Sequence, residues 1–112
     1  MALIYKIVSA MLFEAQGDAF AGAGVDLADG FIHFSAGEQV KETAARHYFG
    51  QNGLLLVAVE AESLGQALKW EVSRGGALFP HLYGELPLSA VLWARPLPQS
   101  ADGGHDFSGF SL

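Results

Sequence analysis

Two short segments concentrate side chains that can bind or transfer protons, and each has the alternating pattern of a β-strand. One spans residues 29–35 and the other residues 79–85. Alternate side chains of a strand point to the same face, so each segment presents its polar groups together. The residues on these two faces are His33 and Ser35 in the first segment, and His81, Tyr83 and Glu85 in the second. Imidazole, hydroxyl and carboxylate groups on such a surface fit a polar small molecule, and His or Glu there could transfer a proton or hold a ribose.

The same residue types also have purely structural interpretations. His33 fits a half-buried strand position bonded to a backbone carbonyl, and Ser35 fits a helix cap. Arg46, on the helix expected after these two residues, is the arginine best placed to reach an anionic group. Glu71 is either a buried carboxylate with a raised pKa or a solvent-facing partner of Arg74.

Several other kinds of site are excluded by the sequence. There is no cysteine, so disulfides, thiolate metal sites and a cysteine nucleophile are ruled out. The histidines lack the close pairing typical of local metal ligands, and no metal site is expected. They stand at His33, His47, His81 and His105. Nucleophile-elbow, Walker and dinucleotide-fold patterns are also absent.

Length and charge limit the class of protein and its partners. The chain has 112 residues, of which 51% are hydrophobic and 16% charged, with a formal net charge of −6. This size favours one compact domain. The negative charge argues against nucleic acid and anionic membranes as partners, and a small-molecule ligand is expected instead. The lack of cysteine fits a cytoplasmic protein, and the oligomeric state stays open.

Short strands and helices that alternate along the chain are expected to position the two segments. The run 54–59 has the length of a strand and is aliphatic enough to lie in the centre of a sheet, covered on both faces. The other expected elements are strands over 3–8, 69–72 and 91–94, a helix over 10–16 with Ser9 as its N-cap, a helical turn within 63–68 and a turn at 74–76.

The two polar segments themselves are expected to be strands. Residues 30–35 are predicted as one strand, followed by a capping box of Ser35 and Glu38 and a helix to about residue 49. Residues 78–86 are predicted as an irregular strand at a sheet edge or bulge, because a proline and a glycine interrupt it.

Two further segments are expected to be less regular. Residues 18–29 form a pliable loop that could cover a site, with room for a helical turn. Residues 99–112 form a Gly- and Ser-rich tail after a single domain over 1–98, and this tail orders only if Phe107 and Phe110 dock.

The chain resembles the small bacterial domain-of-unknown-function family 952. The resemblance runs from Ile4 to about Pro96, and the stretches around His33 and His81 are its most specific parts. The matching pieces are Ile4–Ile7, Asp29–Ser35, Gln39 with Thr43–Arg46, Trp70–Glu71 and Phe79–Gly84. No activity is established for that family as such, so the resemblance adds little about function.

Residues 32–35 also resemble, more weakly, a motif of the ADP-ribosyltransferase-like fold, in particular its tRNA 2′-phosphotransferase and DNA-modifying branches. That fold places His-x-Ser or His-x-Thr on a strand before a helix. The resemblance implies a split sheet that binds NAD between its parts. His33 would then bond the nicotinamide ribose and Tyr83 would pack on the nicotinamide ring. Glu71 or Glu85 would stabilise the oxocarbenium-like sugar or orient the acceptor.

The chain departs from those branches at three points. Lys6 stands where they often have His, no clear Glu-x-Glu or Gln-x-Glu motif closes the pattern, and the arginine set of the phosphotransferases is missing. A tRNA substrate is therefore not expected.

We therefore expect a single α+β domain, ADP-ribosyltransferase-like, with a split or strongly twisted mixed or antiparallel sheet and short flanking helices. Its cleft is expected to bind NAD or a related nucleotide-sugar, with ribosyl transfer or hydrolysis if it is an enzyme. The candidate ligand-binding residues are His33, Ser35, Arg46, His81 and Tyr83, and the candidate catalytic residues are Glu71 and Glu85. The alternative is a non-enzymatic interaction or regulatory module whose tail and 18–29 loop contact a partner.

Overall fold

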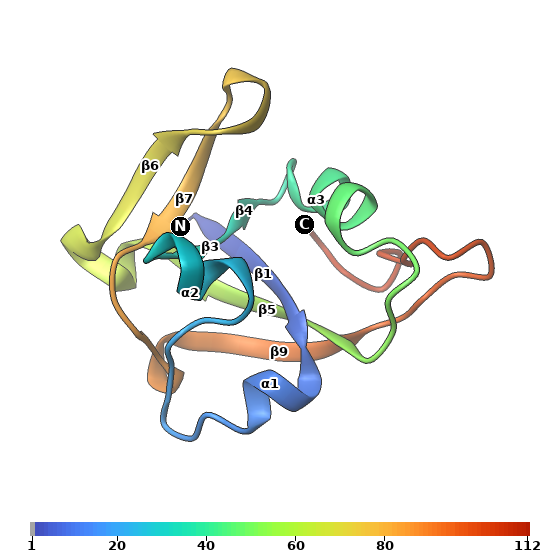
Figure 1. Cartoon of the computed structure of the whole chain (residues 1–112), viewed down its shortest axis with the longest axis horizontal. Coiled ribbons are helices and arrows are strands. Elements are labelled where there is room, and N and C mark those ends of the chain that lie inside the picture. The colour runs from blue at the N-terminus through green and yellow to red at the C-terminus, as the bar shows by residue number, and fades with distance from the viewer. Residues whose placement is uncertain (1) are drawn as a thin grey trace.

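Strands β1 (Leu3–Ser9) and β5 (Leu54–Glu60) pair antiparallel along their whole length and form the centre of the largest sheet. Strands β4 (Ser35–Ala36) and β9 (Val91–Leu97) complete it, in the order β4-β1-β5-β9. The computed structural model describes residues 2–112 apart from the side chain of Arg74. Figure 1 shows β1, β5 and β9 crossing the middle of the molecule. The continuous apolar run thus occupies the central position expected of it.

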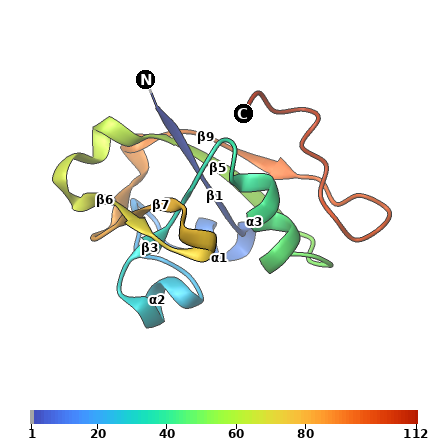
Figure 2. The same ribbon diagram turned by 90° about the horizontal axis from the view of Figure 1, so that it is seen from above.

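Two smaller antiparallel sheets complete the β-structure. The first has the order β3-β7-β6 and is built from β3 (Ile32–His33), β7 (Leu78–Leu82) and β6 (Leu68–Val72). The second pairs β2 (Ala19–Phe20) with β8 (Leu86–Pro87). The hairpin of β6 and β7 projects from the body of the molecule (Figures 1 and 2).

Short helices connect and cover the strands. The α-helices are α1 (Ala10–Glu14), α2 (Val25–Asp29) and α3 (Val40–His47), and the 3₁₀ segments are η1 (Ala61–Ala67), η2 (Arg74–Gly76) and η3 (Leu88–Ala90). The Ser9 hydroxyl accepts a hydrogen bond from the Leu12 amide at 3.5 Å, which confirms Ser9 as the N-cap of α1. None of the helices in residues 2–112 combines the length and apolar character needed to cross a lipid bilayer.

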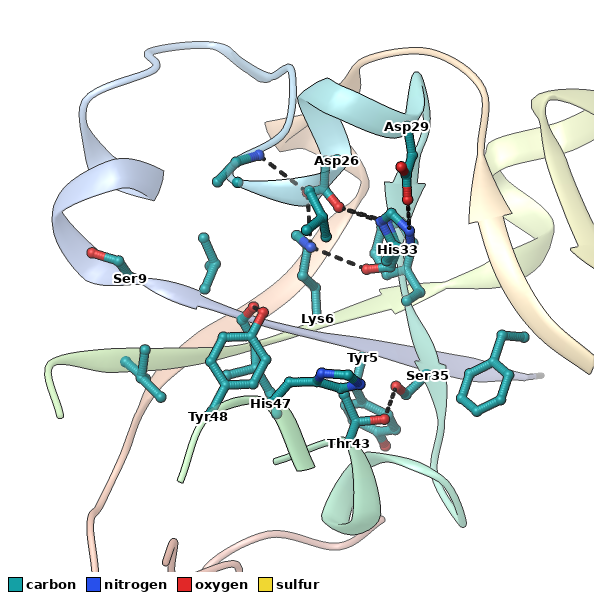
Figure 3. A pocket seen from close by; sticks show the side chains of 18 of the residues that line it. Tyr5, Lys6, Ser9, Asp26, Asp29, His33, Ser35, Thr43, His47 and Tyr48 are labelled. Atoms are coloured by element: carbon teal, nitrogen blue, oxygen red, sulfur yellow. Dashed lines mark hydrogen bonds and ion pairs between the residues drawn. The ribbon is translucent and has the colours of Figure 1, made fainter. Parts of the chain in front are cut away.

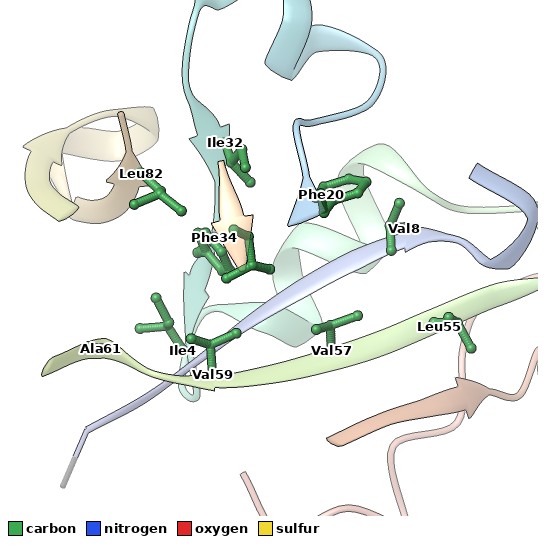
Figure 4. Close-up of a cluster of buried hydrophobic side chains, with 11 residues drawn as sticks. Ile4, Val8, Phe20, Ile32, Phe34, Leu55, Val57, Val59, Ala61 and Leu82 are labelled. Carbon is green, nitrogen blue, oxygen red and sulfur yellow. The ribbon is translucent and has the colours of Figure 1, made fainter. Parts of the chain in front are cut away.

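Alternate side chains of β1 and β5 enter two separate hydrophobic clusters, because successive strand residues point to opposite faces. One cluster fills the space between the largest sheet and the β3-β7-β6 sheet (Figure 4). Its buried members are Ile4, Val8, Phe20, Ile32, Phe34, Leu55, Val57, Val59, Ala61, Leu82 and Leu86. Burial on both faces explains why 54–59 is apolar at every position instead of alternating.

The second cluster lies on the opposite face of the largest sheet, under α3 and the C-terminal segment. Its buried members are Tyr5, Ile7, Val40, Ala44, Leu54, Leu56, Ala58 and Leu97. Phe107 and Phe110 pack against it, and the Phe110 ring stacks on Trp93 with 5.7 Å between ring centroids. The two aromatic residues of the tail are therefore docked, whereas the division of the chain at residue 98 stays a prediction.

The chain thus forms one compact α+β domain with antiparallel sheets and short helices, as the sequence indicates. The expectation of one strand over residues 30–35 was wrong. β3 pairs with β7, whereas β4 pairs with β1, so the chain passes from one sheet to another at Phe34. The buried Phe34 marks the change, since its amide donates to the carbonyl of Pro80 at 3.0 Å.

Two other local predictions were also wrong. Ser35 does not cap a helix: it lies in β4, its hydroxyl is 2.9 Å from that of Thr43, and α3 begins only at Val40. The N-cap residue of α3 is Gln39, whose side chain makes no capping bond to the helix and instead accepts from the Ala36 amide at 2.9 Å. Strand β7 is not an edge strand, because β3 and β6 pair with it on both sides. Pro80 is tolerated there as a buried residue whose carbonyl is used by Phe34.

Candidate functional site

A cavity opens along the free edge of β1, at the point where the two larger sheets diverge (Figure 3). β4 pairs with β1 only at Ile4 and Tyr5, so among the described residues no strand lies beside that edge from Lys6 onward. The cavity has a volume of about 660 Å³, within the range of ~300–1,000 Å³ typical of small-molecule sites. Its lining comes from β1, α1, the α2 segment, β3, β4, α3 and β7.

A buried ion pair closes one side of this cavity. Lys6 projects from β1 toward α2, and its Nζ lies 2.9 Å from Oδ2 of Asp26 (Figure 3). Nζ also donates to the backbone carbonyl of His33 at 3.1 Å. The two side chains are only 6% and 1% exposed. Lys6 therefore joins β1, α2 and β3 at a single point.

Asp26 accepts hydrogen bonds from two backbone amides in addition to its contacts with Lys6 and the His33 ring. Its Oδ2 accepts from the Ala23 amide at 3.1 Å, and its Oδ1 accepts from the His33 amide at 3.0 Å. Burial would raise the pKa of Asp26, but the hydrogen bond from the His33 side chain and the charge of Lys6 outweigh it and lower the pKa to about 2. Burial lowers the pKa of Lys6, and Asp26 opposes that effect. The carboxylate is therefore ionised at neutral pH.

His33 is held between two carboxylates of α2. Its Nδ1 lies 2.6 Å from Oδ1 of Asp26, and its Nε2 lies 3.1 Å from Oδ2 of Asp29. Both ring nitrogens are therefore occupied by the protein itself. His33 orients the α2 segment against β3, and its ring forms part of the cavity wall.

The turn after α2 determines where these carboxylates lie. Helix α2 ends at Gly30, which has φ of 83° and ψ of 15°, a left-handed conformation that glycine adopts without a Cβ clash. At Gly22 an added Cβ would lie 2.8 Å from Cβ of Asp26. The 18–29 segment, predicted as a loop with room for a helical turn, contains β2 and α2, and most of its residues from Ala23 onward contribute to the cavity lining.

The opposite side of the cavity carries hydroxyl groups. The Ser35 hydroxyl lies 2.9 Å from that of Thr43 on α3. The Tyr48 hydroxyl donates to the carbonyl of Ile7 at 3.1 Å, on the edge of β1 that lacks a strand partner. Burial and the carboxylate of Asp26 raise the pKa of Tyr48. This side can therefore offer neutral donors and acceptors to a ligand.

His81 reaches the cavity from β7 and is bonded to Glu71 of β6. Its Nδ1 lies 2.8 Å from Oε1 of Glu71, and the Tyr83 hydroxyl donates to the same oxygen at 2.8 Å. Hydrogen bonds from His81 and then Tyr83 lower the pKa of Glu71. The Phe31 ring packs against all three neighbouring rings, with centroids 4.2 Å from His81, 4.5 Å from His33 and 5.1 Å from Tyr83.

The structure brings most of the sequence-predicted residues together. His33, Ser35 and His81 line the cavity, and Glu71 and Tyr83 join it through His81. The other two lie outside the lining: Arg46 pairs with Glu42 at 3.5 Å on the exposed side of α3, and Glu85 is exposed beyond Gly84. Their roles stay predictions that this placement does not favour. The alternative pairing of Glu71 with Arg74 falls outside the described side chains.

Sequence reasoning missed the ion pair that closes one side of the cavity. Lys6 interrupts an apolar strand between Ile4 and Val8, and such a charged residue on an inward face is the signal that could have indicated a buried partner. Asp26 gave no comparable signal, because it lies in a segment predicted as a loop. No group of three or more His, Cys, Asp or Glu side chains within the described part of the chain is arranged to hold a metal ion.

The chain is similar to a known family in sequence and to solved structures in fold. The family model described as "Protein of unknown function (DUF952)" matches residues 9–94, and the chain belongs to this family. The crystal structure of protein CC0527 from Caulobacter crescentus is 54% identical, with a TM-score of 0.91 over 96% of each chain. The solution structure of the same protein is also 54% identical, with a TM-score of 0.85 over 96% of this chain and 94% of that one. No curated protein matches the chain significantly.

Proposed function

We propose that the cavity binds the sugar and ring end of NAD or of a related nucleotide-sugar. The observation that supports this is the convergence of Ser35, Thr43 and His81 from two strands and a helix on one cavity of about 660 Å³, with the His33 ring in its wall. Convergent polar groups in a preformed concave site are the usual mark of a small-molecule site. The hydroxyls of Ser35, Thr43 and Tyr48 suit the hydroxyls of a ribose, and the Phe79 ring in the lining suits a planar ring.

Charge determines how such a ligand would lie. Lys6 is neutralised by Asp26, and Asp29 adds a second carboxylate to the lining. Among the described side chains no arginine lines the cavity. A pyrophosphate that entered the cavity would lose its hydration, and the described side chains of these walls offer no unpaired positive charge to offset that cost. The walls therefore favour an uncharged or cationic group. The sugar and ring therefore enter the cavity, while the phosphates stay in solvent.

Calorimetric titration with NAD, ADP-ribose and nicotinamide tests this proposal. Two substitutions on α2 distinguish binding in the cavity from binding elsewhere on the surface. Val25 lines the cavity, whereas Leu27 lies on the same helix outside it, and both side chains are exposed. We expect NAD to bind the native chain and Leu27→Trp alike, and to bind Val25→Trp at least about tenfold more weakly, because the larger ring obstructs the cavity. Absence of binding at millimolar concentrations of all three ligands would overturn the proposal.

The second candidate is a non-enzymatic interaction module, which one surface feature favours. Large apolar side chains on the first two α-helices are exposed, namely Met11, Leu12, Val25 and Leu27. Contiguous exposed apolar surface commonly marks an interaction site, and Leu12 and Val25 both border the cavity. Light scattering on the native chain and on a Met11→Ser/Leu27→Ser variant distinguishes the candidates. A native oligomer that the double substitution dissociates supports the module, and an unchanged monomer counts against it.

A further inference from the structure

His81 differs from the other cavity histidine, His33, in how its ring nitrogens are used. Both nitrogens of His33 face carboxylates, at 2.6 and 3.1 Å. His81 has one such partner, Glu71, at 2.8 Å from Nδ1. Among the described residues Nε2 of His81 has no hydrogen-bond partner, although the side chain lines the cavity and is only 7% exposed. One nitrogen of a buried imidazole is therefore left for a ligand.

The surroundings of His81 fix its orientation. The Glu71 carboxylate holds Nδ1, and the Tyr83 hydroxyl holds that carboxylate at 2.8 Å. The Phe31 ring lies 4.2 Å from the imidazole, between centroids, and limits its rotation. A carboxylate that accepts the Nδ1–H of a histidine leaves the Nε2 lone pair available as a base.

We infer that His81 and Glu71 form a proton-accepting pair, with Nε2 of His81 as the base for a water or hydroxyl group held in the cavity. This makes the cavity an active site for hydrolysis or group transfer at an electrophilic carbon. The inference rests on the proposed function only in requiring that a ligand enter the cavity. It assigns catalysis to His81, with Glu71 as a positioning residue and Tyr83 as the residue that orients Glu71.

The proposed reaction is a displacement at the electrophilic carbon by a water or hydroxyl oxygen. The attacking oxygen forms a bond to the electrophilic carbon as its O–H bond breaks, and the proton passes to Nε2 of His81. The bond from that carbon to the leaving group breaks, and the electron pair goes with the leaving group. His81 then returns the proton to the leaving group or to bulk water. The Glu71 carboxylate stabilises the transient imidazolium throughout.

Charged and titratable groups from neighbouring strands face His81. Strand β6 contributes Glu71 together with Lys69, which stands opposite His81 in the strand register. Strand β3 contributes His33, whose ring centroid lies 5.4 Å away, with Asp26 and Asp29 beyond it. Among these groups Glu71 is the carboxylate bonded to the imidazole, so we expect its loss to move the pH profile of the reaction rate most.

Hydrolysis of p-nitrophenyl acetate, an activated ester, tests the inference whatever the natural ligand is. We expect the native chain to release nitrophenolate faster than an equal concentration of free imidazole. His81→Gln should lose at least about tenfold of the rate, in line with removal of a general base. His105→Gln is the matched control, because His105 lies outside the cavity lining and should leave the rate unchanged. Equal rates for His81→Gln and the native chain would overturn the inference.

The pH dependence of the ester hydrolysis rate shows whether Glu71 positions His81 for proton transfer or only stabilises the fold. In Glu71→Gln the midpoint of the rate profile should move to lower pH, because the carboxylate no longer stabilises the imidazolium. Glu14→Gln, an exposed carboxylate outside the cavity, should leave the midpoint in place. An unmoved midpoint in Glu71→Gln, with a native-like melting temperature, would contradict the assignment.

Chemical modification of the native chain provides a test that does not depend on any variant folding. Diethyl pyrocarbonate, followed by peptide mass spectrometry, should modify His81 at Nε2 more rapidly than His33, whose nitrogens are both occupied. Faster modification of His33 would contradict the inference. Reactive His81 without NAD binding would overturn only the proposed ligand, whereas NAD binding with an unreactive His81 would overturn only the proton-accepting pair.

Discussion

Nζ of Lys6 lies 2.9 Å from Oδ2 of Asp26, in a place where both side chains are almost completely buried. This pair ties β1 to the α2 segment and therefore determines the shape of the cavity wall. Buried ion pairs are stable only as complete units, since removal of one partner leaves an uncompensated charge. Loss of this ion pair should therefore strongly destabilise the fold around the cavity.

Replacing Asp26 by Asn should strongly destabilise the fold. The buried Lys6 would lose its counter-charge, and we expect the free energy of unfolding to fall by about 3–5 kcal/mol. Asp29→Asn is the matched control on the same helix: its carboxylate is half exposed and pairs with His33 at 3.1 Å, so the loss should stay below about 1 kcal/mol. Urea denaturation measures both, and similar losses in the two variants would contradict the central role of Asp26.

The pH dependence of stability should follow the carboxyl group of Asp26. Its folded pKa of about 2 lies below the unfolded value of about 3.9. The stabilisation is therefore fully present above the unfolded value and is lost as the pH falls toward 2. The shift corresponds to about 2–3 kcal/mol. A ¹³C NMR titration of the Asp26 carboxyl carbon measures this directly, and a midpoint near the unfolded value would contradict it.

Gly30 should be required for the position of α2. Its left-handed φ of 83° makes Gly30→Ala cost about 1 kcal/mol, because a Cβ disfavours that conformation. Gly109→Ala is the control, since no atom lies within 4 Å of an added Cβ and its φ is not in the left-handed region. That variant should change stability by less than about 0.5 kcal/mol. Thermal unfolding compares them, and equal melting temperatures would argue against strain at Gly30.

Phe110 should stabilise the fold without affecting the cavity. Its ring stacks on Trp93, and the Arg95 guanidinium lies 4.7 Å from its centroid. Phe110→Ala should therefore lower stability by about 1–2 kcal/mol. Leu92→Ala, at an exposed position next to Trp93 on β9, should cost less than about 0.5 kcal/mol. Melting curves and NAD titration together check this, and weaker NAD binding in Phe110→Ala would show that the tail belongs to the site.

The sequence predicts the core better than it predicts the site. The run 54–59 has one interpretation, because a continuous aliphatic segment of that length fits a strand covered on both faces. Residues 30–35 have the alternation of one strand, but pattern alone does not show that the chain changes sheets at Phe34. His33 and Ser35 still reach the same cavity, since the two sheets diverge around it.

The ion pair shows why the rest of the site is hidden from the sequence. Lys6 and Asp26 are twenty positions apart, and their contact depends on how β1 and α2 pack. Local propensity contains no information about such a contact. The same holds for Glu71, which reaches His81 only because β6 and β7 pair in the observed register.

The most direct test of ligand binding in the cavity is a titration of ¹⁵N-labelled protein with NAD, followed by amide chemical shifts. We expect shifts that saturate at Lys6, His33, Ser35 and His81, with little change at Leu92 on the outer strand of the largest sheet. Shifts confined to β9 and the C-terminal segment, or no shifts at millimolar NAD, would contradict the account.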